Sequence, residues 1–236
     1  MASAPFPAAA AATTATASVS PSPSPSTSPS TSGPTVGFDL DMTLIDSRPG
    51  IHACYLALAE RTGAYIDADL AVSRLGPPLV EEIAHWFPAE DVAAMADLYR
   101  SMYPAIAIAA TPAMDGAREA IAAVQAAGGR AIVVTAKYEP SAKLHIEHLG
   151  LAPDAVIGDL WAEQKAEALR EHGASVYVGD HIGDVRGARA AEALSVAVAT
   201  GPCSAAELTA AGADVVLAGL GEFPAWLAGY RPADRA

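Results

Sequence analysis

Short apolar runs, spaced along the chain by longer stretches with helical periodicity, constrain the fold more than any other feature of this sequence. Runs of this length, bounded by Gly, Thr or Asp, are typical of buried strands. Strands that alternate with helices pair in parallel, because each helix carries the chain back to the same edge of the sheet. We therefore expect an α/β fold built on a doubly wound parallel sheet. The predicted strands cover residues 36–38, 131–135, 155–158, 175–179, 195–199 and 214–217.

Punctuation residues mark the helices between these strands. Asp115 is placed to cap a helix that ends at Gly128. A second helix is predicted over residues 161–172 and ends at Gly173 in the same way.

The alternation of strands and helices disappears between residues 49 and 112. Apolar residues recur there at the spacing of one helix face, and no strand pattern is convincing. We therefore predict a small helical insert after the first strand. The apolar residues that indicate its helices are Ile51, Tyr55, Leu58, Val92, Met95, Tyr99 and Met102.

The first 34 residues differ in composition from the rest of the 236-residue chain. Thirty of them are Ala, Ser, Pro or Thr, and no charged side chain occurs before Asp39. Proline alternating with Ser or Thr favours extended, solvated backbone that buries almost no apolar surface. We predict a disordered tail over residues 1–34, a core formed by residues 35–48 and 113–232, and a small helical domain formed by the insert, residues 49–112, which is called the cap domain below.

Net charge and cysteine content narrow the partners and the compartment. The chain carries 27 acidic and 14 basic residues, a net charge of −13 at pH 7. A protein this acidic repels nucleic acid and anionic lipid, and we find no run of about 18 apolar residues that would span a membrane. Cys54 and Cys203 have no metal-ligand or C-x-x-C spacing. We expect no nucleic-acid or membrane partner, no secretory leader and a cytoplasmic location.

Two of the predicted strands run directly into paired acidic residues. Asp39 and Asp41 follow the first strand, and Asp180 and Asp184 follow the strand at 175–179. Ligands bind at the carboxyl ends of strands in open α/β sheets, so these side chains are expected to meet in one crevice. One carboxylate of such a pair can attack an electrophile while the other transfers a proton; the alternative is an acidic turn that caps a helix. Converging carboxylates repel each other unless a hard cation neutralises them, which predicts Mg²⁺.

Two further positions suit a phosphate group. Thr135 ends the strand at 131–135 and, with the backbone N–H of Ala136, offers donors to phosphate oxygens. Lys165, one of only three lysines, lies on another connection between strand and helix and supplies a point charge. Alone, each residue would be interpreted as a helix cap or a surface side chain. Their order after two acidic strand ends favours a phosphate site.

The order of these motifs resembles that of the haloacid dehalogenase (HAD) superfamily, specifically its phosphatases with a helical C1 cap after the first strand. Further matches, at residues 46–51 where the insert begins and at residues 75–79 and 100–103 within it, are similar to the phosphoglycolate phosphatase and nucleotidase-like branch. The resemblance covers residues 36 to about 228 and implies a Rossmann-like core. The motifs that carry it are Asp39-x-Asp41-x-Thr43, Thr135, Lys165 and Gly179-Asp180-x-x-x-Asp184.

The resemblance implies a role for each motif residue. Asp39 would be the nucleophile that forms an aspartyl-phosphate, and Asp41 would be the general acid and then the base. Thr135 would bind phosphate oxygens, and Lys165 would position the nucleophile and offset its charge. The implied Mg²⁺ ligands are Asp39, the Asp41 backbone carbonyl and Asp180, with Asp184 supporting the metal site.

Three positions depart from the usual pattern of the family. Ala136 stands where Ser or Asn is common, and Ala166 follows Lys165 where proline is usual. His181 lies inside the implied metal loop. Because Mg²⁺ prefers oxygen ligands, we interpret His181 as a neighbour of the site whose role is open.

These expectations favour a Mg²⁺-dependent phosphatase that acts on a small phosphorylated metabolite, phosphoglycolate-like or nucleotide-like. A phosphomutase passes through the same aspartyl-phosphate and stays an alternative, as does a non-catalytic module that binds a phosphate ligand. Dehalogenase chemistry needs no second carboxylate and no metal, so Asp41 with Asp180 argues against a dehalogenase. A phosphonate hydrolase of this superfamily needs a lysine in the insert, and this chain has none there, which argues against that activity.

Substrate preference is expected to reside in the helical insert. Because the protein is acidic overall, an anionic leaving group must be held by local cations, and arginine suits a carboxylate or a phosphate. The candidate substrate-binding residues are Arg48, Arg74 and Arg100, of which Arg100 is the leading one. The alternative is that each arginine pairs with an acid such as Glu82 or Asp97. The sequence leaves the oligomeric state open.

Overall fold

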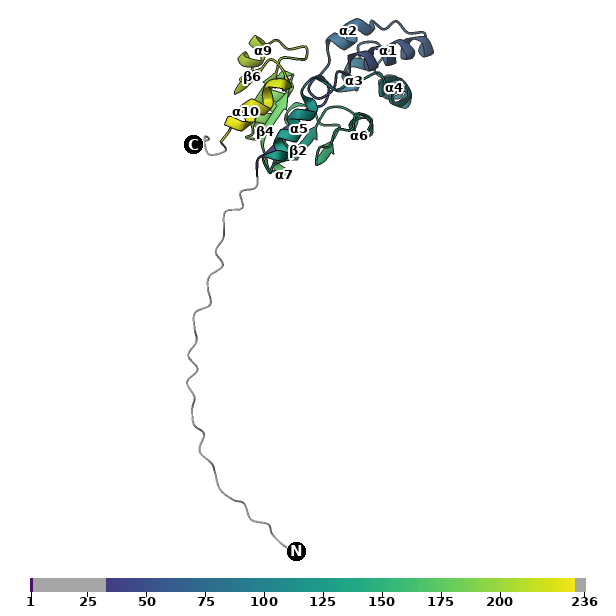
Figure 1. Ribbon diagram of the computed structural model, residues 1–236. Helices are drawn as coiled ribbons and strands as arrows, with labels where there is room; N and C mark the ends of the chain where they lie inside the picture. The colour runs from purple at the N-terminus through teal and green to yellow at the C-terminus, as the bar shows by residue number, and fades with distance from the viewer. Residues whose placement is uncertain (2–32, 232–236) are drawn as a thin grey trace. The chain divides into compact units, whose positions relative to one another are not determined.

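The computed structural model describes Met1 and residues 33–231 of the chain (Figure 1). The predicted disordered tail therefore lies almost entirely outside the described residues, as does residue 232 at the end of the predicted core. Gly33 and Pro34, assigned to the tail, contact the core instead. Gly33 N–H donates to the Gly128 carbonyl oxygen at 3.0 Å, and Arg130 N–H donates to Pro34 O at 3.2 Å. The folded body thus begins before residue 35.

All six predicted strands are present within one residue of their predicted bounds, in the described part of the chain. They are β1 (Thr35–Phe38), β2 (Arg130–Val134), β3 (Ala155–Ile157), β4 (Ala174–Gly179), β5 (Leu194–Val198) and β6 (Val215–Leu217). They form one sheet in the order β3-β2-β1-β4-β5-β6, and every neighbouring pair is parallel. The predicted doubly wound α/β sheet is confirmed.

The helices outside the insert follow the strands in alternation. α5 begins differently from the prediction: Gly116, with a φ of +85°, occupies its N-cap position, so the predicted capping by Asp115 is wrong. A Cβ on Gly116 would lie 2.5 Å from the Gly221 backbone nitrogen, and only glycine fits this close approach. These helices are α5 (Ala117–Ala126), α6 (Glu139–His148), α7 (Lys165–Glu171), α8 (Ile182–Ala190), α9 (Ala205–Ala210) and α10 (Phe223–Gly229), with 3₁₀ turns η1 (Ala162–Gln164) and η2 (Leu220–Glu222).

Both faces of the sheet are buried, and alternate strand residues point to opposite faces. Val36 and Phe38 pack in one hydrophobic cluster with α5 and α10, which lie side by side in Figure 1. Ile132 and Val134 pack in a second cluster with α7 and α8. Because neither face is open to water, the strands are continuous apolar runs, which is why they were recognisable in the sequence.

The segment between β1 and α5 is helical, as predicted. Its helices share a separate hydrophobic cluster, in which the ring centroids of Tyr55 and Tyr99 are 5.0 Å apart. Trp86 and Phe87 pack against this cluster. The helices are α1 (Arg48–Thr62), α2 (Ala68–Ser73), α3 (Leu79–Ile83) and α4 (Val92–Ala107), and Figure 1 shows them grouped together. The division of the body into a core and a cap domain stays a prediction.

None of the helices in the described residues is both long and apolar enough to cross a membrane. Cys54 and Cys203 are buried and form no disulfide. Burial raises the pKa of the Cys54 thiol to about 12 and also raises the pKa of Cys203. Neither thiol is therefore a ready nucleophile at neutral pH.

The strand order reverses beside β1, because the chain continues to β2 on one side and returns to β4 on the other. At such a point the connections after the two neighbouring strands separate and leave a crevice at their carboxyl ends. Asp39 directly follows β1, and Asp180 directly follows β4. The topology thus brings the two acidic pairs of the sequence to the same crevice.

The sheet's main cluster depends on the contact between β1 and α10, where the Phe38 and Phe223 rings meet edge to face at 5.3 Å. Phe223 is fully buried, so Phe223→Ala should lower the free energy of unfolding by about 3–5 kcal/mol in urea titrations. Leu56→Ala removes a half-exposed side chain from α1 and should change it by less than about 0.5 kcal/mol. Equal effects of the two substitutions would contradict this placement of the core.

Candidate active site

The loop after β1 carries the first acidic pair. Asp39 N–H donates to Val178 O of β4 at 2.8 Å, which continues the pairing of the two strands by one residue. The chain then turns tightly, and Met42 takes a left-handed φ of +59°. As a result, Asp39, Asp41 and Thr43 share one short loop at the carboxyl end of β1.

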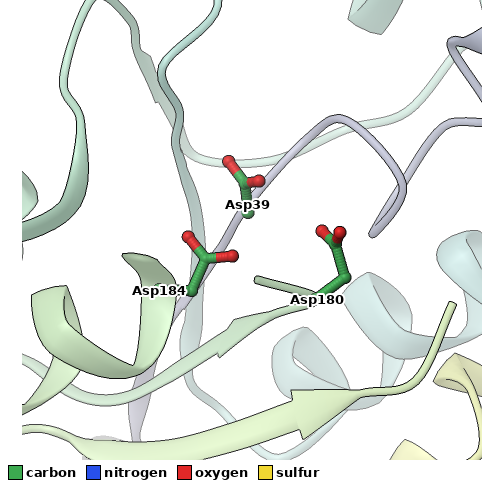
Figure 2. A group of neighbouring side chains, drawn as sticks. All are labelled: Asp39, Asp180 and Asp184. Atoms are coloured by element: carbon green, nitrogen blue, oxygen red, sulfur yellow. The ribbon is translucent and has the colours of Figure 1, made fainter. Parts of the chain in front are cut away.

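Asp39, Asp180 and Asp184 converge where β1 and β4 end (Figure 2). One carboxylate oxygen from each lies within 4.8 Å of the other two, and the three side chains are buried. Thr43 Oγ1 donates to Asp180 Oδ1 at 2.8 Å and so orients that carboxylate. These donors are all oxygens and carry surplus negative charge, which fits a hard divalent cation such as Mg²⁺. The Asp41 carboxylate lies outside this triad, which leaves its backbone carbonyl as the predicted ligand.

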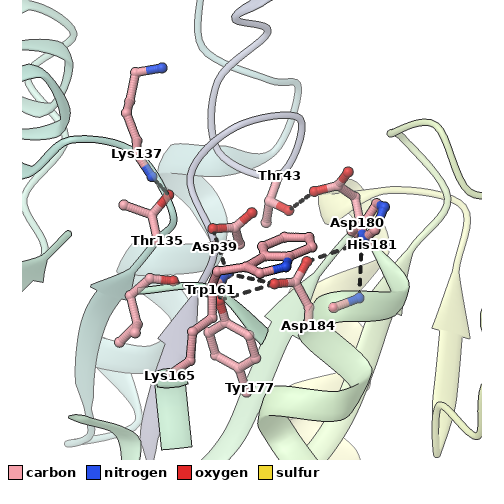
Figure 3. A network of polar contacts seen from close by, with 12 residues as sticks. Asp39, Thr43, Thr135, Lys137, Trp161, Lys165, Tyr177, Asp180, His181 and Asp184 are labelled. Carbon is pink, nitrogen blue, oxygen red and sulfur yellow. Dashed lines mark hydrogen bonds and ion pairs between the residues drawn. The ribbon is translucent and has the colours of Figure 1, made fainter. Parts of the chain in front are cut away.

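Lys165, at the start of α7, is fully buried and joins two of these carboxylates. Its Nζ donates to Asp39 Oδ1 at 3.0 Å, to Asp184 Oδ1 at 2.6 Å and to the Tyr177 hydroxyl at 2.8 Å (Figure 3). The Tyr177 hydroxyl donates in turn to Val134 O at 2.6 Å. The three N–H groups of the ammonium therefore each have a protein acceptor.

Thr135 directly follows β2 and lies beside Asp39 in the wall of a cavity of about 290 Å³. Its N–H donates to Ile157 O at 3.0 Å, which holds the backbone in place. Its Oγ1 accepts from Lys137 N–H at 3.2 Å, so the hydroxyl proton is available to a phosphate oxygen. Ala136, the other predicted phosphate contact on this loop, also lines the cavity.

Lys137 is a residue of the site that sequence reasoning missed. Its Nζ donates to Asp41 Oδ1 at 2.8 Å and lies 4.7 Å from the centre of the Tyr103 ring of α4. The available signal was its position in the same loop as Thr135 in a chain with three lysines. Tyr177 was missed as well, because a tyrosine inside an apolar strand is indistinguishable from an ordinary core residue.

The two residues of the first acidic pair have opposite electrostatic environments. Burial raises the pKa of Asp39 to about 7, opposed by Lys165 and reinforced by neighbouring carboxylates. Burial and the same repulsion raise the pKa of Asp180 well above its usual value. Burial acts in that direction on Asp41 too, but the Lys137 ammonium outweighs it and lowers the pKa of this carboxyl. Asp41 is thus held as a carboxylate. The three carboxyl groups of the triad, by contrast, have too little positive charge around them to stabilise all three in the ionised form.

The structure does not bring Arg48 to the cavity. Arg48 lines a separate hollow and donates from Nε and Nη2 to the two carboxylate oxygens of Asp46, at 2.8 and 2.7 Å. Its position therefore gives no support to the expectation that it binds substrate.

Arg74 and Arg100 do line the cavity, and both also contact acids. Arg74 donates from Nε at 3.0 Å and from Nη2 at 2.5 Å to Glu82. Arg100 donates from Nη1 to Asp97 at 3.2 Å, while its Nε is buried and has no partner among the described residues. The Nε donor of Arg100 is therefore unpaired among the described residues, whereas the Nε donor of Arg74 is bonded to Glu82.

The chain matches known proteins over most of its body. A model of the haloacid dehalogenase-like hydrolase family matches residues 36–189, and a second one, HAD-hydrolase-like, matches residues 161–223. The chain belongs to the haloacid dehalogenase-like hydrolase family. The resemblance inferred from the motifs is confirmed.

Individual relatives carry two different names. Tyrosine-protein kinase PtkA of Mycobacterium tuberculosis is 31% identical over 65% of this chain, which spans 57% of that relative's length. Phosphoglycolate phosphatase of Xylella fastidiosa is 32% identical over 66% of this chain and 76% of its own. A haloacid dehalogenase-like protein of Streptococcus pneumoniae has the same fold, with a TM-score of 0.73 over 83% of this chain and 99% of its own at 24% identity.

The surplus charge of the triad predicts a pH-dependent response to Mg²⁺. The pKa of Asp39 rises from 3.8 to about 7 on folding, so the folded state binds the proton of this carboxyl more tightly than the unfolded state. Without a cation, in EDTA, the stability gained from this proton is lost as pH rises from about 4 to about 7. A cation competes with that proton, so added Mg²⁺ should raise the melting temperature more at about pH 7.5 than at about pH 5. Thermal unfolding with EDTA or Mg²⁺ at both pH values measures this. An equal rise in melting temperature at both pH values, or no rise, would contradict the assignment of the carboxylate triad as a Mg²⁺ site.

Proposed function

We propose that this protein is a Mg²⁺-dependent phosphatase that hydrolyses a small phosphomonoester through an aspartyl-phosphate on Asp39. The observation that carries the proposal is one constellation: Asp39 lines a cavity with Asp41 and Thr135, while Lys165 holds Asp39 from the buried side. Membership of a hydrolase family and a relative named phosphoglycolate phosphatase support it.

In the first step, an Asp39 oxygen attacks the phosphorus atom of the substrate. Lys165 binds Oδ1 of Asp39, which leaves Oδ2 as the attacking atom. The new Asp39–phosphorus bond forms as the ester bond breaks, and its electron pair leaves with the ester oxygen, which receives a proton from Asp41. Thr135 and the Ala136 N–H hold the non-bridging phosphate oxygens.

In the second step, water attacks the aspartyl-phosphate and Asp41 takes its proton, releasing inorganic phosphate and restoring Asp39. The ion pair with Lys137 keeps Asp41 in the carboxylate form that this step needs. The first step needs the protonated form, so the ion pair must open, and a substrate dianion competes with Asp41 for Lys137. Mg²⁺ held by Asp39, Asp180 and the Asp41 carbonyl, with Asp184 in support, would neutralise charge on the phosphoryl group.

The cavity favours a small substrate. Its volume of about 290 Å³ suits a phosphorylated metabolite of modest size, phosphoglycolate-like or nucleotide-like, and not a macromolecule. Arg74 and Arg100 of the insert face this space together with Lys137. We place the reaction in the cytoplasm, in keeping with the acidic composition and the two buried, unpaired cysteines.

Two other outcomes use the same phosphoryl site. A phosphomutase would pass the phosphoryl group from Asp39 to a sugar hydroxyl instead of water. The relative named tyrosine-protein kinase raises a second candidate, transfer from a nucleotide to tyrosine. Phosphate release from a panel of phosphomonoesters, run beside ATP with a tyrosine peptide, separates the three outcomes by product.

Removing the metal and the nucleophile should each abolish phosphate release. We expect no turnover in EDTA and recovery on adding Mg²⁺, because the carboxylates alone repel a dianionic substrate. Asp39→Asn should form no phosphoenzyme, whereas Asp41→Asn should form it with a loss in rate of about 10²–10⁴. Phosphate release and mass spectrometry of acid-quenched protein measure both effects. A covalent phosphoenzyme in Asp39→Asn would refute the nucleophile, and full turnover in EDTA would refute the metal.

Arg100 is expected to contact an anionic leaving group. Arg100→Ala should weaken kcat/KM for the best anionic substrate by about 1–3 kcal/mol while sparing an aryl phosphate, because only the former loses a charged hydrogen bond. Arg48→Ala is the matched control, since this arginine lies outside the cavity, and should change neither value. Equal losses of Arg100→Ala on both substrates would indicate a structural role instead.

A further inference from the structure

His181 has a fixed orientation between the metal-site carboxylates. It is the N-cap residue of α8, and its Nδ1 accepts from the Gly183 N–H at 3.0 Å. The backbone N–H of His181 donates to Asp184 Oδ2 at 3.0 Å. Because Nδ1 is an acceptor, the ring proton resides on Nε2, and the opposite edge of the imidazole points away from the helix start.

A tryptophan supports this ring from the side. The centroids of Trp161 and His181 are 5.1 Å apart, with the rings inclined by 49°. Trp161 also covers Gly183, where a Cβ would lie 2.7 Å from its Cη2 atom. The hydrogen bond and the aromatic contact together leave the imidazole little freedom to rotate.

One face of the imidazole meets the helical insert. A Cβ on Gly76 would lie 2.8 Å from His181 Cδ2, so the ring rests against the glycine backbone. Gly76 has a φ of +131°, a conformation that residues with a side chain rarely adopt. It belongs to residues 74–78, here called the pocket loop, which joins α2 to α3 and lines the same cavity as Asp39 and Asp41.

We propose that His181 is a positioning residue whose ring forms a fixed stop for the pocket loop and so sets how closely the loop approaches Asp39. Gly76 is the complementary half of the contact, because any side chain there would push the loop away from the ring. The stop determines the space above the nucleophile, and therefore the size of the leaving group that fits. This last consequence rests on the proposed function, whereas the contact itself does not.

The pocket loop needs such a stop because its other contacts, such as the ion pair of Arg74 with Glu82, tie it to the insert itself and do not set its distance from Asp39. It lies between helices of six and five residues, which are too short to be stable without tertiary contacts. Pro77 and Pro78 restrict the loop's backbone, so a displacement at Gly76 moves the loop as a unit. Shifts of about 1 Å near reacting atoms can change rates by about 10²-fold.

Two substitutions separate the stop from the helix cap. His181→Asn keeps a side-chain acceptor for the start of α8 but removes the ring. His181→Phe keeps a ring of similar shape but removes the acceptor. Gly76→Ala adds the colliding Cβ, and Gly63→Ala is its matched control, because Gly63 also has a positive φ, +72°, with nothing within 4 Å of an added Cβ.

Cleavage by trypsin after Arg74, in the pocket loop, reports release of the loop without requiring any activity. Because proteolysis follows the population of the open state, His181→Asn and Gly76→Ala should be cut there about tenfold faster than the parent protein. His181→Phe and Gly63→Ala should be cut at the parental rate. Cleavage after Arg61, at the end of α1, is the internal reference for the His181 variants. Runs with EDTA and with Mg²⁺ exclude an effect through the metal.

Kinetics with a short-chain and a bulky aryl phosphomonoester test the consequence for substrate size. His181→Asn should raise KM for the short substrate about tenfold with a smaller change in kcat, and should reduce the preference for it over the bulky one. His181→Phe should retain the preference. Parental cleavage at Arg74 in both His181→Asn and Gly76→Ala would overturn the proposal, as would a release seen in His181→Phe but not in His181→Asn. Faster cleavage at Arg74 in a protein that hydrolyses no phosphomonoester would refute the proposed function and leave the stop intact.

Discussion

The ammonium group of Lys165, buried between Asp39, Asp184 and the Tyr177 hydroxyl, is the interaction on which the rest of the site depends. A charge with no access to water is stable only when all its partners are in place, and losing one leaves an uncompensated buried charge. These partners come from the end of β1, from β4 and from α8, while Lys165 itself begins α7. The folded sheet and the fixed orientation of the Asp39 carboxylate are therefore formed together.

Charge is distributed unequally around this centre, which divides the site into two electrostatically different parts. On one side, the buried ammonium of Lys165 pairs with two of three clustered carboxylates, which leaves surplus negative charge. On the other, Asp41 has its own counterion in Lys137, which also lies over the Tyr103 ring of α4. Lys137 thus connects the Asp41 carboxylate to Tyr103 of the helical insert. Under the proposed mechanism, this contact would couple substrate recognition by the insert to proton transfer by Asp41.

Much of the fold and part of the site could be predicted from sequence, and the exceptions have common causes. The strands were recognisable because both sheet faces are buried, and Asp39, Thr135 and Lys165 because each lies where a strand or connection ends. The helix cap assigned to Asp115 was wrong because η2 presses against the chain there, which only the folded structure reveals. Arg48 was a reasonable candidate by charge, but its carboxylate partner lies two residues away and holds it outside the cavity.

By itself, the sequence determined the alternation of strands and helices, the helical insert and the order of the acidic motifs, because periodicity and strand ends are local properties of the chain. Only the tertiary structure decided which cation meets which carboxylate and where the insert touches the core. The pairing of Lys137 with Asp41 and the contact of His181 with Gly76 join residues far apart in the chain. Such contacts depend on how the sheet and the insert pack, and no local pattern in the sequence records them.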